Sequence, residues 1–193
     1  MLVPLLRSRL FALVLLCSLT FASAQSGQEK MPPESYTGVA VGTGGAAGGK
    51  MMSFNFRVTR YTTDEQVNNY VKLLKEKGQD ALRSVLEKQD CGRINPVRST
   101  GNQIALARKR QQGPNTIITI VTARQMPFVE LYNNGRSVGY PFGFLQVTLD
   151  GQGKGIGQIM AAAKLRFNKK SGEYEIESFG NQYIKATNVR PNG

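Results

Sequence analysis

The chain of 193 residues carries 25 Lys and Arg against 13 Asp and Glu, holds no histidine and has two cysteines. Without an imidazole it cannot form Ser-His-Asp triads, Cys-His pairs or histidine metal sites. Its formal net charge of +12 at pH 7 favours anionic partners through long-range attraction, although solubility alone would also account for the charge.

Residues 1–24 have the three parts of a secretory signal peptide. Arg7 and Arg9 precede an apolar run from Leu10 to Leu16, and an Ala-Ser-Ala tripeptide ends at Ala24. The run is too short to cross a bilayer, which needs about 20 apolar residues. We therefore expect cleavage after Ala24 and export to the periplasm, the cell surface or the medium. A retained anchor is the alternative.

Cleavage would change both the charge and the cysteine content. Loss of Arg7 and Arg9 takes two from the 25 Lys and Arg, which against 13 Asp and Glu leaves a formal charge of +10. Cys91 would be the remaining cysteine, which excludes internal disulfides and tetrahedral zinc clusters. A lone thiol in an exported chain indicates either a buried side chain, which we favour, or an intermolecular disulfide. No later segment is apolar enough to cross a membrane, so we expect no integral membrane protein after cleavage.

Residues 25–50 are polar at first and end in VGTGGAAGGK. Glycine and alanine without apolar periodicity cannot offset the entropy cost of ordering, so this segment is predicted to be a flexible linker. The remaining residues, 51–193, are enough for a single domain with one core.

The domain begins with a strand and two helices. Alternation of Phe54, Phe56 and Val58 with polar residues predicts a half-buried strand. Behind Thr63 as N-cap, apolar residues at helical spacing predict a helix that ends at Gly78. A second short helix is predicted at about 80–89, so that the two form a helical hairpin.

From Gly92 onward the sequence reads as strands joined by short turns, which favours antiparallel neighbours. The strand-like segments are 102–110, 116–124, 128–132, 141–150, 156–167, 173–179 and 182–189. Residues 117–121 are apolar on both faces, which predicts a central strand covered on both sides. The fold class expected is α+β: a curved, predominantly antiparallel sheet of about seven to eight strands packed with the two-helix hairpin. This order resembles the start of the helix-grip fold of hydrophobic-ligand carriers, without that fold's long C-terminal helix.

One hairpin can be placed in register. Pairing the apolar faces of 159–167 and 174–176 around a loop at 169–172 sets Arg166 opposite Glu175 and Lys164 opposite Glu177. The acidic row in 173–177 is therefore interpreted as an ion-paired surface and not as an acid–base pair.

Three motifs suggest chemistry that their context does not support. The glycines in LDGQGKGIGQ (149–158) lead into a strand and not into a helix, so they predict a hairpin turn and not a phosphate cradle. In GRSVG, Ser137 lacks both a histidine and a strand-to-helix turn. Arg108, Lys109 and Arg110 alternate in side along a strand, which favours a protected sheet edge over a nucleic-acid site.

The aromatic segment GYPFGF (139–144) is the densest apolar feature. Its simplest interpretation is core. The alternative is the mouth of a pocket in the curved sheet, with nearby charged groups that orient a ligand. The candidate ligand-binding residues are Arg124, Phe128, Glu130, Tyr132, Arg136, Tyr140, Phe142 and Phe144.

We therefore expect an exported, non-enzymatic binding protein for an apolar or amphiphilic anionic ligand, such as a lipid or a small amphiphile, or for an anionic envelope component. The first alternative is a structural or protein-interaction module that residues 25–50 tether in the cell envelope. The second is an enzyme that works without histidine, through Arg124, Glu130 and Asp150. We assign no catalytic residue, metal, cofactor or nucleic-acid partner.

Overall fold

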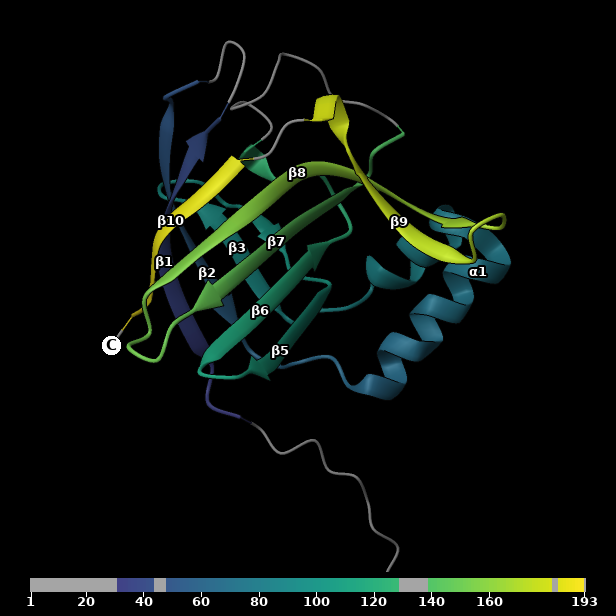
Figure 1. The fold of residues 1–193 in the computed structure, drawn as a ribbon, viewed down its shortest axis with the longest axis horizontal. Coiled ribbons are helices and arrows are strands. Elements are labelled where there is room, and N and C mark those ends of the chain that lie inside the picture. The colour runs from purple at the N-terminus through teal and green to yellow at the C-terminus, as the bar shows by residue number, and fades with distance from the viewer. Residues whose placement is uncertain (1–30, 44–47, 129–138, 182–183, 193) are drawn as a thin grey trace, which may run out of the picture.

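The computed structural model describes residues 31–43, 48–128, 139–181 and 184–192 (Figure 1). In this part the chain forms helix α1 (Asp64–Leu86), a 3-10 turn at Phe179–Asn181 and the following strands: β1 (Glu34–Gly42), β2 (Met51–Val58), β3 (Gly92–Pro96), β4 (Asn102–Gln103), β5 (Leu106–Gln112), β6 (Asn115–Thr122), β7 (Phe142–Leu149), β8 (Gly155–Asn168), β9 (Glu173–Ser178) and β10 (Ile184–Pro191).

The strands form one antiparallel sheet that curls into a half-barrel (Figure 1). Its order is β4-β3-β2-β1-β10-β8-β7-β6-β5, and β9 pairs with the second half of the long strand β8. Helix α1 lies beside the far end of β8 and the hairpin that β8 forms with β9 (Figure 1). The structure confirms the α+β class with a curved antiparallel sheet.

The two ends of the sheet order are tied together. Strands β4 and β5 lie at opposite ends, yet only Ile104 and Ala105 separate them in the chain. The Ile104 amide donates to the carbonyl of Gly92, the first residue of β3, over 2.8 Å, and the Ala105 amide donates to the Val121 carbonyl in β6 over 2.8 Å. This bend therefore bridges β3 and β6 and bounds the space that the sheet encloses.

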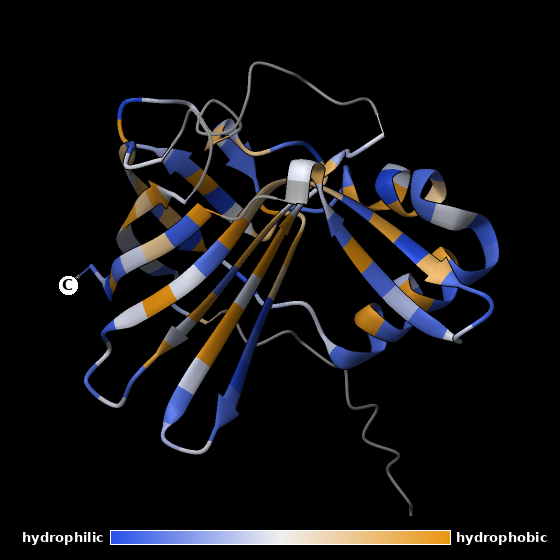
Figure 2. Ribbon diagram, turned by 45° about the horizontal axis from the view of Figure 1, so that its top comes forward, coloured by the Kyte–Doolittle hydropathy of each residue, from blue (hydrophilic) through white to orange (hydrophobic). Residues whose placement is uncertain are grey.

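Two cores lie on opposite faces of the sheet. Ile118 and Ile120 of β6 point into the enclosed core, whereas Val121 and Ala123 join the core under α1. On the α1 side Val121 is buried but Ile117 and Thr119 are only half-buried, so 117–121 is covered on both faces at its end alone. Strand β6 also lies beside the terminal strand β5 and not at the centre. Cys91, 1% exposed, lies in the enclosed core, which confirms that the thiol is buried. Figure 2 shows apolar segments alternating with polar ones along the strands.

The prediction of a flexible linker is wrong for residues 34–42, which form β1 between β2 and β10. Every second residue from Tyr36 to Gly42 is buried. Three of these four inward residues are glycine or alanine, so the alternation carries almost no hydropathy signal. Small residues are needed here, because a Cβ on Gly38 would lie 2.9 Å from Cζ of Phe54.

The predicted two-helix hairpin is replaced by one helical element with a kink. Gly78, at φ 80° and ψ −177°, leaves helical geometry and kinks α1 between its two helical parts. The predicted N-cap is confirmed: the Thr63 hydroxyl accepts from the Gln66 amide, and the Gln66 side chain accepts from the Thr63 amide. Strands also outnumber the seven to eight expected within the described residues, because β1 and β3 were missed and 102–110 bends into β4 and β5. The strand predicted at 128–132 lies, beyond Phe128, outside the described residues.

The two hairpins predicted in detail are confirmed. Residues 150–154 turn from β7 into β8, and the Asp150 carboxylate accepts from the amides of Gln152 and Lys154 over 2.9 and 2.8 Å. In the next hairpin Arg166 lies opposite Glu175 and forms an ion pair of 2.5 Å. Lys164 lies opposite Glu177 as predicted, but among the described residues Glu177 accepts from the Tyr140 hydroxyl and forms no ion pair. Among the described residues, no helix has the length and hydrophobicity that a membrane span requires.

The basic run in β5 is divided between the two faces, as expected. Arg108 forms an ion pair with Asp64 at the start of α1, over 2.5 Å. Lys109 points the other way and pairs with Glu34 of β1 over 2.8 Å. Both charges therefore tie β5 to other elements of the domain.

Candidate functional site

The structure does not bring the described members of the predicted aromatic site together. Phe128 is fully buried in the enclosed core, where it makes an edge contact with Phe54 at 5.5 Å between ring centroids. Phe142 is fully buried in the core under α1, and Phe144 packs against the same core. Phe128 therefore lies on the opposite face of the sheet from Phe142 and Phe144, and the three side chains share no pocket.

Tyr140 belongs to neither core. Its hydroxyl donates a hydrogen bond to the Glu177 carboxylate, and its ring contacts Phe179 at 5.3 Å between centroids. The hydrogen bond to Glu177 is the main reason that the pKa of Tyr140 lies above its ordinary value. Glu130, Tyr132, Arg136 and the Ser137 motif lie outside the described residues.

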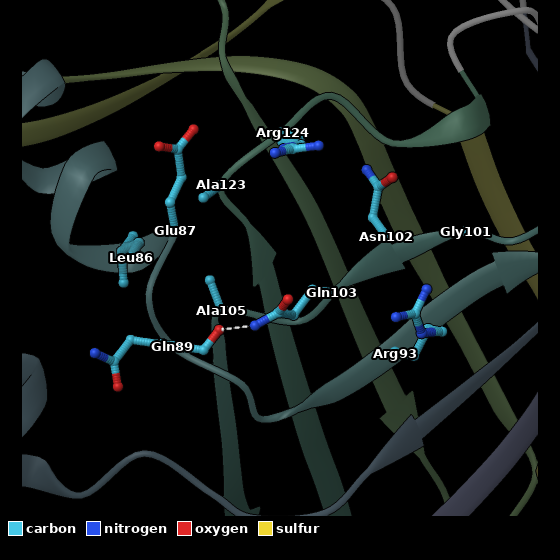
Figure 3. Close-up of a pocket in the computed structure, with 10 residues that line it drawn as sticks. All are labelled: Leu86, Glu87, Gln89, Arg93, Gly101, Asn102, Gln103, Ala105, Ala123 and Arg124. Carbon is cyan, nitrogen blue, oxygen red and sulfur yellow. Dashed lines mark hydrogen bonds between the residues drawn. The ribbon is translucent and has the colours of Figure 1, made fainter.

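Arg124, by contrast, lines a cleft. The cleft has a volume of about 220 Å³ and lies between the C-terminal end of α1, strands β3 and β4, and the segment after β6 (Figure 3). Its lining residues are Leu86, Glu87, Gln89, Arg93, Gly101, Asn102, Gln103, Ala105, Ala123 and Arg124. We call it the arginine cleft.

The floor of the arginine cleft is apolar and its walls are polar. Leu86, Ala105 and Ala123 all belong to the core under α1, so the floor is the edge of that core. The short alanine side chains leave the space that a longer residue would fill. In Figure 3 Gln103 points across this floor toward Gln89.

Two guanidinium groups come to the cleft from distant segments. Arg93 lies on β3, where Ile94 and Pro96 face the core and Arg93 faces solvent. Arg124 follows β6 in a turn that the buried hydroxyl of Thr122 holds by donating to the Arg124 carbonyl over 2.5 Å. In Figure 3 Asn102 lies between the two guanidinium groups.

The positive charges outweigh the negative one in the arginine cleft. Arg93 donates to the carbonyl of Thr100 over 2.9 Å, and Arg124 is exposed and has no ion pair among the described residues. The Glu87 carboxylate on the opposite wall already forms an ion pair with Arg83 over 3.0 Å. A guanidinium presents several N–H donors in a plane, which suits a carboxylate or phosphate.

Hydrogen bonds to the backbone fix the amide side chains of the cleft. Gln103 donates to the Gln89 carbonyl over 2.5 Å (Figure 3), and Asn102 donates to the Gln125 carbonyl over 2.5 Å. Gly101, at φ +62°, lets β4 approach β3, since a Cβ there would lie 2.2 Å from the Ile94 carbonyl oxygen. The cleft is therefore organised before any ligand arrives, which reduces the entropy cost of binding.

A second polar cluster ties β1 to β5 at the other end of the domain. Glu34 accepts hydrogen bonds from the hydroxyls of Tyr36 and Tyr61 over 2.6 and 2.8 Å and from Lys109 over 2.8 Å. Burial raises the pKa of Glu34, but these hydrogen bonds outweigh burial and leave the pKa below its ordinary value. Burial, followed by the bond to Glu34, raises the pKa of both tyrosines. Each polar group of this Glu34 cluster has its hydrogen-bond partner within the cluster, so we interpret the cluster as structural.

No group of three or more His, Cys, Asp or Glu that could hold a metal ion occurs in the described part of the chain. Among the residues that line the arginine cleft, the one acid is Glu87, which is already paired. The arrangement therefore suits the binding of an anion better than proton transfer.

Sequence reasoning found Arg124 but not its partners. Arg93, Asn102 and Gln103 lie in short segments without a recognisable motif. The signal that could have pointed to them is Gly101, since a glycine beside two amide residues marks a close approach of strands. No family model, no curated protein and no solved structure matches the chain.

Proposed function

We propose that this protein is an exported, non-enzymatic binding protein that holds an anionic group between Arg93 and Arg124. The observation that carries the proposal is the arginine cleft itself: two guanidinium groups and two fixed amides above an apolar floor. The ordinary role of such a set in proteins is recognition of carboxylate or phosphate oxygens.

The packing of the enclosed core favours a site at the surface over one inside the sheet. Phe54, Phe56 and Phe128 are at most 1% exposed and fill the space that a carrier would leave for its ligand. Each such ring stabilises the fold by about 1.5–3 kcal/mol through burial. Opening this core for a ligand would sacrifice that stabilisation.

The size of the cleft narrows the ligand class. A volume of about 220 Å³ is below the range of about 300–1,000 Å³ that is common for drug-sized ligands. We infer that the cleft takes a small anion or the anionic headgroup of an amphiphile, whose nearest carbons contact Leu86, Ala105 and Ala123. An acidic group on an envelope component would fit in the same way.

Native mass spectrometry tests this function. The full chain, with its leader, is produced in an exporting host and purified without detergent, and its mass is compared before and after denaturation. We expect a non-covalently bound acidic molecule that the Arg93→Gln/Arg124→Gln variant no longer retains. Arg98→Gln is the matched control, because Arg98 is exposed and does not line the cleft. A bound molecule that persists in the double variant would contradict the assignment.

Export itself is a separate proposal, and it rests on residues 1–24. N-terminal sequencing of the protein from the periplasm or medium should find Gln25 as the first residue. A chain that stays in the cytoplasm with Met1 intact would count against export.

Strand β9 supports a second candidate function, a protein-interaction module. In the described part of the chain β9 pairs with β8 alone, and Tyr174 and Ile176 are 42% and 49% exposed. A strand edge of this kind can accept a strand from a partner. Crosslinking in the envelope of the exporting host should then give adducts that Ile176→Lys removes and Lys169→Ala does not.

A further inference from the structure

A second hollow lies on the outer face of the sheet, opposite the enclosed core. It runs over β1, β10, β8 and β7 and has a volume of about 970 Å³. A neighbouring hollow of about 500 Å³ shares Thr148, Ile156 and Lys185 with it. Together they form one surface depression over these strands, which we call the outer groove.

An extra residue in β10 shapes the outer groove. On one side of β10, Thr187 pairs with Val39 and Arg190 pairs with Thr37, so Gly38 faces two residues of β10. The same irregularity occurs in the pairing of β10 with β8. Asn188, at φ 51°, is therefore the centre of a β-bulge and one of two non-glycine residues with positive φ in the described chain. Such strain is held in place by its surroundings and is concentrated at functional sites.

The bulge decides which side chains face the groove. In a regular strand Lys185 and Arg190, five residues apart, would lie on opposite faces. With one extra residue between them both are exposed on the outer face, while Ala186 and Val189 are both buried in the enclosed core. The bulge thus adds a cation to this face without a loss of core packing.

The charge of the outer groove is positive. Lys154, Lys185 and Arg190 line it, are exposed and have no ion pair among the described residues. The groove's acid, Asp150, accepts hydrogen bonds from two amides of the turn at 150–154. An anionic partner is therefore favoured.

The remaining lining is rich in hydroxyl groups and has no aromatic side chain. Ser53 and Thr148 offer hydroxyl groups that accept and donate hydrogen bonds. The hydroxyls of Thr37 and Thr187 donate to the carbonyls of Phe54 and Val39, and their oxygens can still accept. Ile156, 63% exposed, supplies an apolar contact among them. Single-stranded nucleic acids are usually held by stacking on aromatic rings, which this lining lacks. A bilayer surface would call for more exposed apolar side chains than Ile156.

We propose that the outer groove binds a segment of an acidic polysaccharide. The hydroxyl groups of the lining match sugar hydroxyls, Ile156 contacts the apolar face of a sugar ring, and Lys154, Lys185 and Arg190 attract carboxylates along the chain. Lining residues on four strands suit a polymer better than an isolated anion. This site is separate from the arginine cleft and shares no residue with it.

Calorimetric titration at low salt with polygalacturonate tests the proposal, with neutral dextran as the control polymer. We expect binding to polygalacturonate but not to dextran. Lys185→Ala/Arg190→Ala should weaken it at least about 10-fold, because two charge contacts of more than about 0.7 kcal/mol each are lost. Lys169→Ala/Lys170→Ala removes the same charge from an exposed turn outside the groove and should change affinity less than about twofold.

Four results would overturn the proposal: no binding to polygalacturonate, equal binding to dextran, equal losses in both double variants, or tighter binding to single-stranded DNA or to anionic vesicles. Circular dichroism and urea unfolding of each variant confirm that its fold is intact. Arg93→Gln/Arg124→Gln should keep full polysaccharide affinity, so a failure of the arginine cleft and a failure of the outer groove are distinguishable.

Discussion

Replacing Glu34 by alanine tests whether β1 and its polar cluster hold the domain together. The substitution removes the acceptor that Tyr36, Tyr61 and Lys109 share over 2.6–2.8 Å. Hydrogen bonds to a charged group stabilise proteins by about 1.5–3 kcal/mol each when buried. Here the Glu34 and Lys109 side chains are 26% and 39% exposed, which lowers the contribution of their ion pair.

We therefore expect Glu34→Ala to lower the free energy of unfolding by about 3 kcal/mol, which corresponds to a fall in Tm of roughly 10 °C for a chain of this size. Urea is the denaturant of choice, since guanidinium chloride would screen the ion pair. Glu173→Gln is the control: Glu173 is exposed, and its side chain forms no hydrogen bond or ion pair among the described residues. Its effect should stay within about 0.5 kcal/mol.

The pH dependence gives the same test a second readout. The pKa of Glu34 is lowered in the folded state, so its contribution is present above the unfolded value of 4.5 and is lost as the pH falls through the folded pKa. Glu34→Gln should flatten the acid limb of the stability curve. Equal unfolding midpoints for Glu34→Ala and the parent chain, or an unchanged acid limb in Glu34→Gln, would refute this reasoning.

Three further predictions concern the backbone, the phenols and the helix start. Gly157→Ala should destabilise the fold by about 2–4 kcal/mol in urea unfolding, since its Cβ would lie 2.1 Å from the Gln146 carbonyl oxygen. Gly151→Ala, with nothing within 4 Å of its Cβ, should be neutral. Because the tyrosines of the Glu34 cluster have raised pKa values, their contribution to stability should be complete below pH 10 and be lost above it, and phenolate absorbance should rise together with unfolding. Thr63→Ala should lower the free energy of unfolding by about 1 kcal/mol in the same assay, because α1 loses its N-cap. If the substitution lowered stability equally in a chain from which α1 had been deleted, a capping role would be contradicted.

The sequence predicted those elements in which the side chains of the buried face and of the exposed face differ strongly in polarity. Arg166 and Glu175 alternate with apolar residues around a short loop, so one register alone buries the apolar set. The same contrast revealed β2 and the capped start of α1. In β1 the contrast is absent, because Gly38, Ala40 and Gly42 face the core.

The arginine cleft could not be predicted because it depends on one bend. Arg93 and Arg124 are brought together where Ile104 and Ala105 bridge β3 and β6, and no local motif marks that bend. The aromatic candidates failed to converge for a related reason. Phe128 and Phe142 lie on opposite faces of the sheet, and density of aromatic residues in the sequence does not say which face each one occupies.

The most direct test of the account is a nuclear magnetic resonance titration of the ¹⁵N-labelled chain with phosphate and with citrate. If an anion is held in the arginine cleft, saturable shifts will concentrate at the amides of 101–103 and at the guanidinium groups of Arg93 and Arg124. Arg93→Gln/Arg124→Gln will abolish these shifts, and Arg98→Gln will leave them unchanged. Saturable shifts centred on Phe54 and Phe128 in the enclosed core, or no saturable shift with either anion, would contradict the account.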